Sequence, residues 1–165
     1  MPNSPRYDDD FFAWTEYQAE VLRTMRGADN RLDREHLAEE IADLGRSERN
    51  AVRNQIRRII EHLLKLAWSG SEEPRYGWMR SIAEARACLR DEMSPALRRD
   101  AETMLPSLYR DGRRQAVLGL QEHGEHEAAT ALPDACPYTL DQIAADEWYP
   151  EPRSEQRRVT HRSEP

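Results

Sequence analysis

The feature that most constrains the fold is an apolar periodicity within residues 34–68. Apolar residues recur there in steps of three, four or eight, at positions 37, 41, 44, 52, 56, 59, 63 and 66. This spacing is typical of one buried helix face. Asp33 is a suitable N-cap, and Leu32 before it can pack on Leu37 in the first turns. The pattern predicts one long central helix over about residues 34–68.

Gly45 is the point at which this helix could be interrupted. A glycine inside a helix costs about 1 kcal/mol relative to alanine. The apolar phase does not shift across Gly45, however, which favours a continuous helix in which Gly45 lets a neighbouring element approach closely. A break at residues 45–47 is the alternative.

Helical periodicity also dominates the rest of the chain, whereas strand-like alternation is nearly absent. A first helix over about residues 11–26 follows the acidic residues 8–10 and ends at Gly27. A helix that follows Pro74 places Trp78, Ile82, Ala85 and Leu89 on one face. The sequence therefore predicts an all-α helical bundle.

Two further helices are expected towards the C-terminus. Ser94 is an N-cap candidate followed directly by proline, and the helix that starts there should reach about Gly124. Pro106 lies inside it and should kink or split it, because proline lacks the N–H donor and crowds the preceding turn. Thr139 and Gln142 fit a capping box for a short C-terminal helix.

Composition bears on the number of domains, the cellular compartment and the kind of partner that can be expected. Residues 7–148 are expected to form a single helical domain, and residues 149–165 a disordered polar tail. No apolar run approaches the roughly 18 residues that span a bilayer, and the N-terminus has no apolar signal core. Two cysteines, Cys88 and Cys136, make no disulfide framework, so a reducing cytoplasm is expected. The net charge of −7 argues against a nucleic-acid partner, and no cofactor motif is present.

Six segments in order resemble a bacterial family known only as domain-of-unknown-function family twenty-nine. They are YDDDFFAW, LDREHLAEEIADLGRSER, EHLLK, WMRSIAEAR, SLYRDGRRQA and LPDACPYTLDQI, within residues 7–145. The resemblance implies a small, soluble, all-helical protein and no established activity. The chain departs from the family pattern after His62, and Ala85 stands where a glutamine usually precedes the arginine Arg86.

Three polar residues share the apolar face of the predicted long helix. At 100° per residue, Glu48, Gln55 and His62 fall within this face at seven-residue spacing. A buried polar group without a partner costs on the order of 1–3 kcal/mol, so each is expected to have a partner on another helix. Arg86 and Tyr109 are the candidates. The three residues either fix the helix register or, at His62, border a small pocket.

Two chemical functions can be read from the same helix. Arg57 and His62 resemble the Arg-x(4–6)-His motif of the metal-independent HEPN ribonucleases, in which the histidine would be the general acid or base. Residues five apart differ by about 140° on a helix, so Arg58 is the better neighbour of His62.

A metal site is the other chemical function. His36, Glu40 and Asp43 lie on one flank and could supply ligands, but an acidic first turn explains Glu40 and Asp43 more simply. The di-iron pattern Glu-x-x-His occurs on no predicted helix.

A partner surface is the third possibility. Arg46, Arg49, Arg53 and Arg57 form a row opposite the apolar face, and acidic residues precede them. Such a divided stripe could pair antiparallel with a second copy, or the arginine row could meet an acidic partner. We therefore expect a non-enzymatic interaction or accessory module that binds itself or another protein. The ribonuclease and the metal-binding bundle are the alternatives.

Overall fold

The computed structural model describes residues 4–27 and 31–153 of the chain. The described residues form six helices and no strand, which confirms the all-α prediction. The helices are α1 (Phe11–Thr24), α2 (Arg34–Trp68), α3 (Arg75–Glu92), α4 (Pro95–Glu122), α5 (His126–Ala131) and α6 (Leu140–Ala144).

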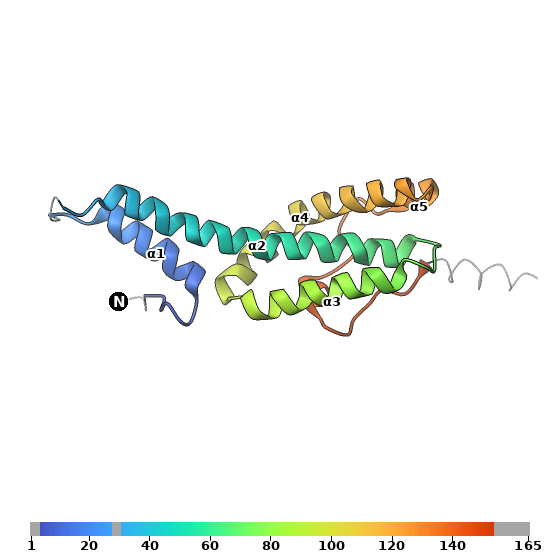
Figure 1. The fold of residues 1–165 in the computed structure, drawn as a ribbon, viewed down its shortest axis with the longest axis horizontal. Helices are drawn as coiled ribbons and strands as arrows, with labels where there is room; N and C mark the ends of the chain where they lie inside the picture. The colour runs from blue at the N-terminus through green and yellow to red at the C-terminus, as the bar shows by residue number, and fades with distance from the viewer. Residues whose placement is uncertain (1–3, 28–30, 154–165) are drawn as a thin grey trace, which may run out of the picture.

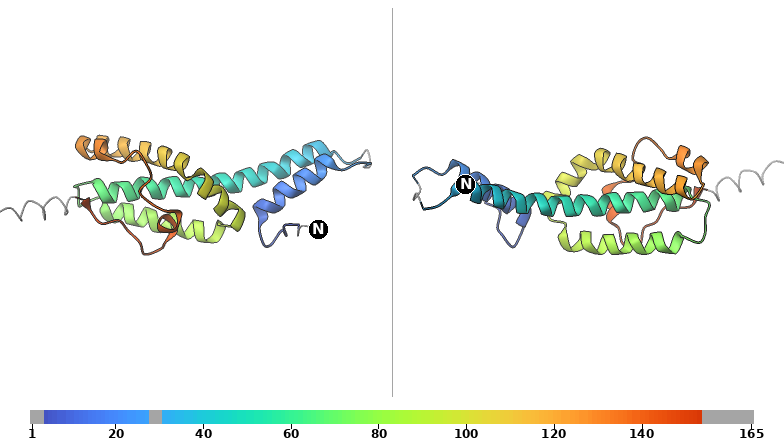
Figure 2. Two further views of the ribbon diagram at one scale, coloured as in Figure 1. Left: turned by 180° about the vertical axis from the view of Figure 1, so that it is seen from behind. Right: turned by 45° about the horizontal axis from the view of Figure 1, so that its top comes forward.

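The long helix α2 runs through both parts of an elongated molecule (Figure 1). Its first half pairs with α1 and projects from the rest of the chain; we call α1 together with residues 34–48 of α2 the arm. Its second half lies between α3 and α4 (Figure 2), and these helices form a bundle with α5 and α6. With 35 residues, α2 is about 52 Å long.

Gly45 does not interrupt α2, so the continuous helix is confirmed and the break is excluded. A Cβ atom at Gly45 would lie only 2.2 Å from the Thr15 hydroxyl oxygen and 3.5 Å from the Phe12 ring. The glycine therefore permits the close approach of α1, as the sequence predicts.

The bundle core surrounds the second half of α2, where Ile56, Ile60 and Leu64 are fully buried. Helix α4 crosses α2 at Gly112, whose Cβ would lie 2.9 Å from the carbonyl oxygen of Arg57. Helices α1 and α4 thus both pack closely on α2 through a glycine at the crossing.

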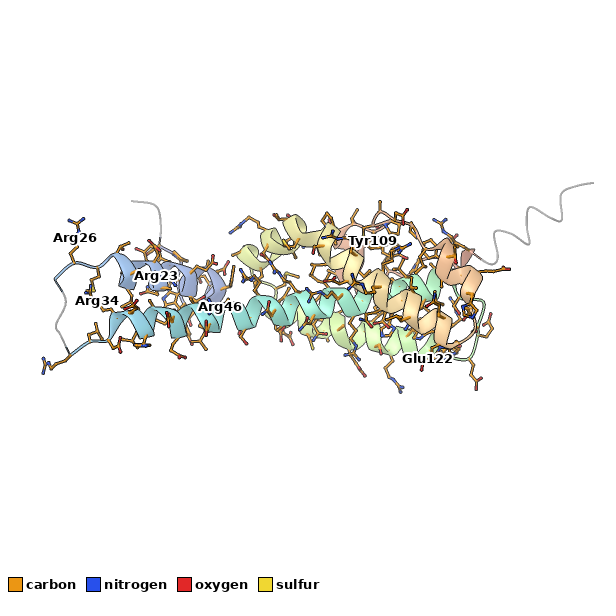
Figure 3. The ribbon with its side chains drawn as sticks, turned by 90° about the horizontal axis from the view of Figure 1, so that it is seen from above. Arg23, Arg26, Arg34, Arg46, Tyr109 and Glu122 are labelled. Atoms are coloured by element: carbon orange, nitrogen blue, oxygen red, sulfur yellow. The ribbon has the colours of Figure 1, made fainter. Side chains whose placement is uncertain are left out.

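Pro106 lies on the exposed side of α4 and does not split it. The axis of α4 changes direction in its first half (Figures 1 and 3), in agreement with a kink. The solvent-facing position explains the tolerance, because water can bond the backbone carbonyl that lacks its helical partner.

The local sequence predicted helix α6 but not helix α5. Thr139 and Gln142 form both hydrogen bonds of the predicted capping box. Helix α5 is only six residues long and was not predicted from the sequence. It is too short for a clear periodicity, and its N-cap, Glu125, is not a strong cap residue and makes no capping hydrogen bond.

The C-terminal segment departs from the predicted tail boundary at residue 149. The ring of Tyr149 lies 5.1 Å from the Arg86 guanidinium, and the guanidinium of Arg153 lies 4.5 Å from the Trp68 ring. Residues 149–153 therefore pack on the bundle, because their aromatic and cationic groups have partners there. The remainder of the predicted tail, residues 154–165, lies outside the described residues.

Candidate functional site

Small side chains form the seam between the two helices of the arm. On α1 the buried residues include Thr15 and Ala19, and on α2 they include Ala38 and Gly45. Small residues bring the two helix axes together, and they leave little room in the seam for large side chains. The larger apolar residues of both helices must therefore lie elsewhere on the arm.

We call the set of these larger apolar residues the arm face. It consists of Trp14, Val21 and Met25 from the α1 side and Leu37, Ile41 and Leu44 from α2. Leu44 is 53% exposed and Met25 is 47% exposed, whereas Trp14 and Ile41 are half-buried. Of the nine large apolar side chains exposed in the described part of the chain, seven belong to the arm and its adjoining residues.

Helix geometry places both sets of residues on the same side of the arm. At 100° per residue, Leu37 and Leu44 lie roughly 100° to one side of the seam on α2. Trp14 and Val21 lie roughly 120–140° from the seam on α1, in the same rotational sense. In an antiparallel pair, rotations of the same sense from the seam point to the same side, so both stripes lie on one side of the arm.

The N-terminal segment extends this surface with aromatic contacts. The ring of Tyr7 lies 5.2 Å from the Phe11 ring and 5.0 Å from the Trp14 ring, edge to face in both cases. Edge-to-face pairs stabilise such clusters beyond their buried area, by about 0.5–1.5 kcal/mol each. The arm face therefore has an aromatic end near the bundle.

The opposite side of the arm is polar. A groove of about 250 Å³ runs there between α1 and α2, lined among others by Glu16, Arg23, Arg46 and Arg49. Arg23 and Arg46 are among the labelled side chains of Figure 3. The arm is therefore amphipathic, with its apolar side unprotected by the remainder of the described chain.

The three polar residues of the α2 seam do not form the predicted ladder of interhelical partners. Glu48, Gln55 and His62 are all half-buried. Within the described residues, Glu48 and Gln55 have no side-chain hydrogen bond, and His62 Nδ1 is buried without a partner. The prediction of partners on another helix is therefore wrong, because the side chains that could bond them serve other parts of the fold.

Arg86 and Tyr109, the expected partners, instead fix the C-terminal segment. Arg86 is 1% exposed and donates to the carbonyl oxygens of Gln142, Ile143 and Asp146 at 3.1, 2.9 and 3.3 Å. The hydroxyl of Tyr109 donates to the carbonyl oxygen of Pro133 at 2.5 Å. Burial raises the pKa of Tyr109 to about 12, so this hydroxyl keeps its donor proton at neutral pH.

Three of the four arginines of the predicted stripe have ion-pair partners within the described chain. Arg53 donates twice to Asp100 on α4, at 2.8 and 2.7 Å, and Arg57 donates to Asp111 at 3.1 Å. Arg46 pairs with Asp43, and the guanidinium of Arg49 lies 5.9 Å from the Phe12 ring. Helix α4 therefore engages Arg53 and Arg57 of the stripe, whereas the side chain of Arg46 is 53% exposed. A partner for the stripe stays a prediction.

The proposed nuclease pair is not brought together. Arg57 faces Asp111 on α4, whereas His62 lies in the electrostatic reach of Glu61, Lys65 and Arg58. Burial lowers the pKa of His62 below its ordinary value; Lys65 and Arg58 act in the same direction, and Glu61 opposes them. Arg58 itself contacts Ser81 and Glu84 on α3. Within the described residues, both Arg57 and Arg58 thus have an acidic partner on another helix rather than a hydrogen bond with His62.

The three candidate metal ligands do not converge on a common point in the structure. His36 is exposed, and its Nδ1 lies 2.7 Å from Asp33 Oδ2, a contact that raises the pKa of the imidazole. Asp43 pairs with Arg46, and Glu40 is exposed. The described part of the chain contains no group of three or more His, Cys, Asp or Glu residues placed to hold a metal ion.

Sequence reasoning did not find the arm face. It assigned Leu37, Ile41 and Leu44 to the buried core because they share the phase of the bundle half of α2. A signal was available in the small residues Ala38, Ala42 and Gly45, which repeat at steps of four and three beside the larger ones. Such a repeat marks the side on which a helix is approached most closely.

The helices and their arrangement define an all-α protein with an amphipathic arm, and none of its described helices is long and apolar enough to cross a bilayer. The chain belongs to the family described as Domain of unknown function DUF29, whose model matches residues 6–149. No curated protein matches the chain.

A solved structure confirms the fold. An α-helical protein of unknown function from Rhodospirillum rubrum ATCC 11170 is similar with a TM-score of 0.76 at 22% sequence identity. The similarity covers 99% of this chain and 100% of that protein. At this identity the likeness concerns the fold alone.

Proposed function

We propose that this protein is a non-enzymatic interaction module that binds a protein through the arm face. The observation that carries the proposal is the concentration of exposed large apolar side chains on one side of the arm, including Leu37 at 40% and Leu44 at 53% exposure. Isolated apolar side chains are common on protein surfaces, whereas contiguous apolar patches of several hundred Å² mark interaction sites.

The shape of the arm supports this function. Helix α1 packs on α2, and outside that contact it reaches the bundle chiefly near the start of α4. Two amphipathic helices side by side present an apolar groove or ridge of the kind that receives further helices. A two-helix arm on its own buries little apolar surface, so covering the arm face with a partner would also stabilise it.

A cytoplasmic location is part of the same proposal. Cys88 and Cys136 are both free thiols, and free thiols suit a reducing compartment.

Site-directed photo-crosslinking tests the arm face in intact cells. A benzophenone amino acid would replace Leu44, and in the matched control it would replace Leu118, which is similarly exposed at 55% but lies on α4 in the bundle. We expect discrete protein adducts with the probe at residue 44 and none above background at residue 118. Equal labelling at both positions, or none at residue 44, would overturn the proposal.

A further inference from the structure

We infer that the arm face binds the arm face of a second copy of this chain, with the two arms packed antiparallel into a four-helix bundle. This inference rests on the proposed function, because it names the partner of the same surface. Three features of the arm carry it: the pattern of charge along α2, the size of the arm face and the absence of an internal cover within the described chain.

The first feature is the order of residues along the α2 side of the arm face. Arg34, Leu37, Ile41, Leu44 and Glu48 follow one another in steps of three and four. This is the spacing of a seam that packs against another helix in a left-handed bundle. The three central residues are apolar, and the two ends carry opposite charges.

The opposite charges at the two ends select an antiparallel arrangement. Arg34 lies towards the free end of the arm (Figure 3), and Glu48 lies about 21 Å away towards the bundle. A parallel pair of arms would place Arg34 beside Arg34 and Glu48 beside Glu48. An antiparallel pair related by a twofold axis near Ile41 places each arginine near the glutamate of the other copy, and this arrangement is self-complementary.

Glu48 has no competing partner within the chain as described. It is half-buried beside the apolar residues, and its carboxylate makes no hydrogen bond or ion pair with any described residue. Arg34 donates to the carbonyl oxygen of Met25 and remains positively charged. A carboxylate at the edge of an apolar surface is stabilised when a cation approaches from the other copy.

The size of the arm face suits a partner of the same size. Fourteen residues of helix extend about 21 Å, and two adjacent helices are about 20 Å wide. This plane of about 400 Å² per copy corresponds to about 800 Å² in the pair, an area at the low end of protein interfaces. A second arm matches these dimensions on both axes.

Sedimentation equilibrium of the purified full chain tests the inference. We expect a dimer at about 100 µM, where a specific interface of this size is occupied. Leu44→Glu should raise the dissociation constant at least about 100-fold, because it places a charge at the centre of the arm face. Leu118→Glu, the matched control, should leave the dissociation constant unchanged. A monomeric wild type, or equal dissociation by both variants, would overturn the inference.

Charge reversal tests the antiparallel arrangement. Arg34→Glu and Glu48→Arg should each raise the dissociation constant about 10-fold, and the double variant should return to within about threefold of wild type. A double variant that binds as weakly as the product of the two single effects would overturn the antiparallel pairing. Circular dichroism and thermal unfolding of each variant establish that the helices remain folded.

The two experiments separate the second-copy inference from the proposed function. A purified monomer combined with crosslinking at residue 44 in cells overturns the second copy and leaves the interaction module standing. Absence of crosslinking at residue 44 together with a purified monomer overturns both.

Discussion

The carboxylate of Asp10 accepts a hydrogen bond from the backbone N–H of Ala96, 86 residues further along the chain, at 2.9 Å. The same carboxylate accepts from Ala13 N at the start of α1 and from the Ser94 hydroxyl at the start of α4. One acidic side chain thus caps two helices and fixes the base of the arm to the bundle. Both helix N-termini favour a negative charge at this point.

We expect Asp10→Ala to lower the free energy of unfolding by about 2 kcal/mol, because it removes the cap of α1 and two bonds to α4. Asp9→Ala is the matched control: Asp9 is exposed, pairs only loosely with Arg6 at 3.7 Å, and should change stability by less than about 0.5 kcal/mol. Urea denaturation of both variants measures the difference. Equal effects would contradict the double-cap assignment.

Gly45→Ala should destabilise the protein by about 1–3 kcal/mol, because the new methyl group would overlap the Thr15 hydroxyl in the tight seam of the arm. Gly77→Ala should have the opposite sign. Gly77 lies inside α3, and a methyl group added there would have no neighbouring atom within 4 Å beyond its own helix. Alanine at this position therefore gains about 0.5–1 kcal/mol of helix propensity.

A double variant identifies the clash itself. Thr15→Ala removes the hydroxyl that the methyl group would meet, so combining it with Gly45→Ala should recover part of the lost stability. Thermal unfolding of the four members of this cycle gives the coupling energy. Strictly additive effects would show that some other contact limits residue 45.

Arg86→Met should cost about 2–4 kcal/mol, because it removes charge-assisted hydrogen bonds to three backbone carbonyl groups around α6. Arg80→Met on the same helix is the control; Arg80 is exposed and should tolerate the change within about 0.5 kcal/mol. Hydrogen exchange should also show the loss of protection concentrated in residues 140–149. Protection lost evenly over the bundle would argue against a local anchoring role.

His62 should make the folded protein sensitive to acid. Burial lowers its folded-state pKa, so the unfolded chain binds the proton more tightly, and stability falls as the pH drops below the ordinary histidine value of about 6.5. His62→Leu removes both the titration and the buried Nδ1 atom that lacks a partner. It should be neutral or stabilising by up to about 1 kcal/mol at pH 7.5. Relative to the wild type, this variant should gain stability at pH 5.5.

His36 provides the comparison of opposite sign. The contact with Asp33 raises the pKa of His36. The contribution of His36 to the free energy of unfolding is therefore present below the ordinary histidine pKa and is lost as the pH rises through the folded-state value. Urea denaturation of His62→Leu and His36→Ala at pH 5.5 and pH 7.5 measures how the free energy of unfolding of each variant changes with pH. The same pH response in both variants would refute the assignment at His62.

Helix boundaries and caps were predictable because they depend on residues close together in the sequence. Asp33, Ser94 and Thr139 each accept the backbone hydrogen bond expected of an N-cap. The continuity of α2 through Gly45 followed from the unbroken apolar phase. These features need only the local preferences of the backbone and the period of the side chains.

The polar contacts of α2 were not predictable in the same way. The sequence placed Arg53 and Arg57 on an outward stripe, and it assigned Arg86 to a partner on α2. In the structure all three serve residues more than 45 positions away along the chain, including Asp100 and Asp111. A long charged side chain can reach several neighbours, so its partner depends on which helix packs there.

The sequence by itself determined that the chain is helical, where its principal helices begin and that α2 is continuous. The tertiary structure decided that the single apolar phase of α2 serves two purposes: Ile59 and Leu66 are buried in the bundle, whereas Leu37 and Leu44 remain exposed on the arm. The physical reason is that periodicity defines a helix face, but only the packing of the other helices determines whether that face is covered. Since α3 and α4 flank the second half of α2 and not the first, the apolar face of the first half stays exposed.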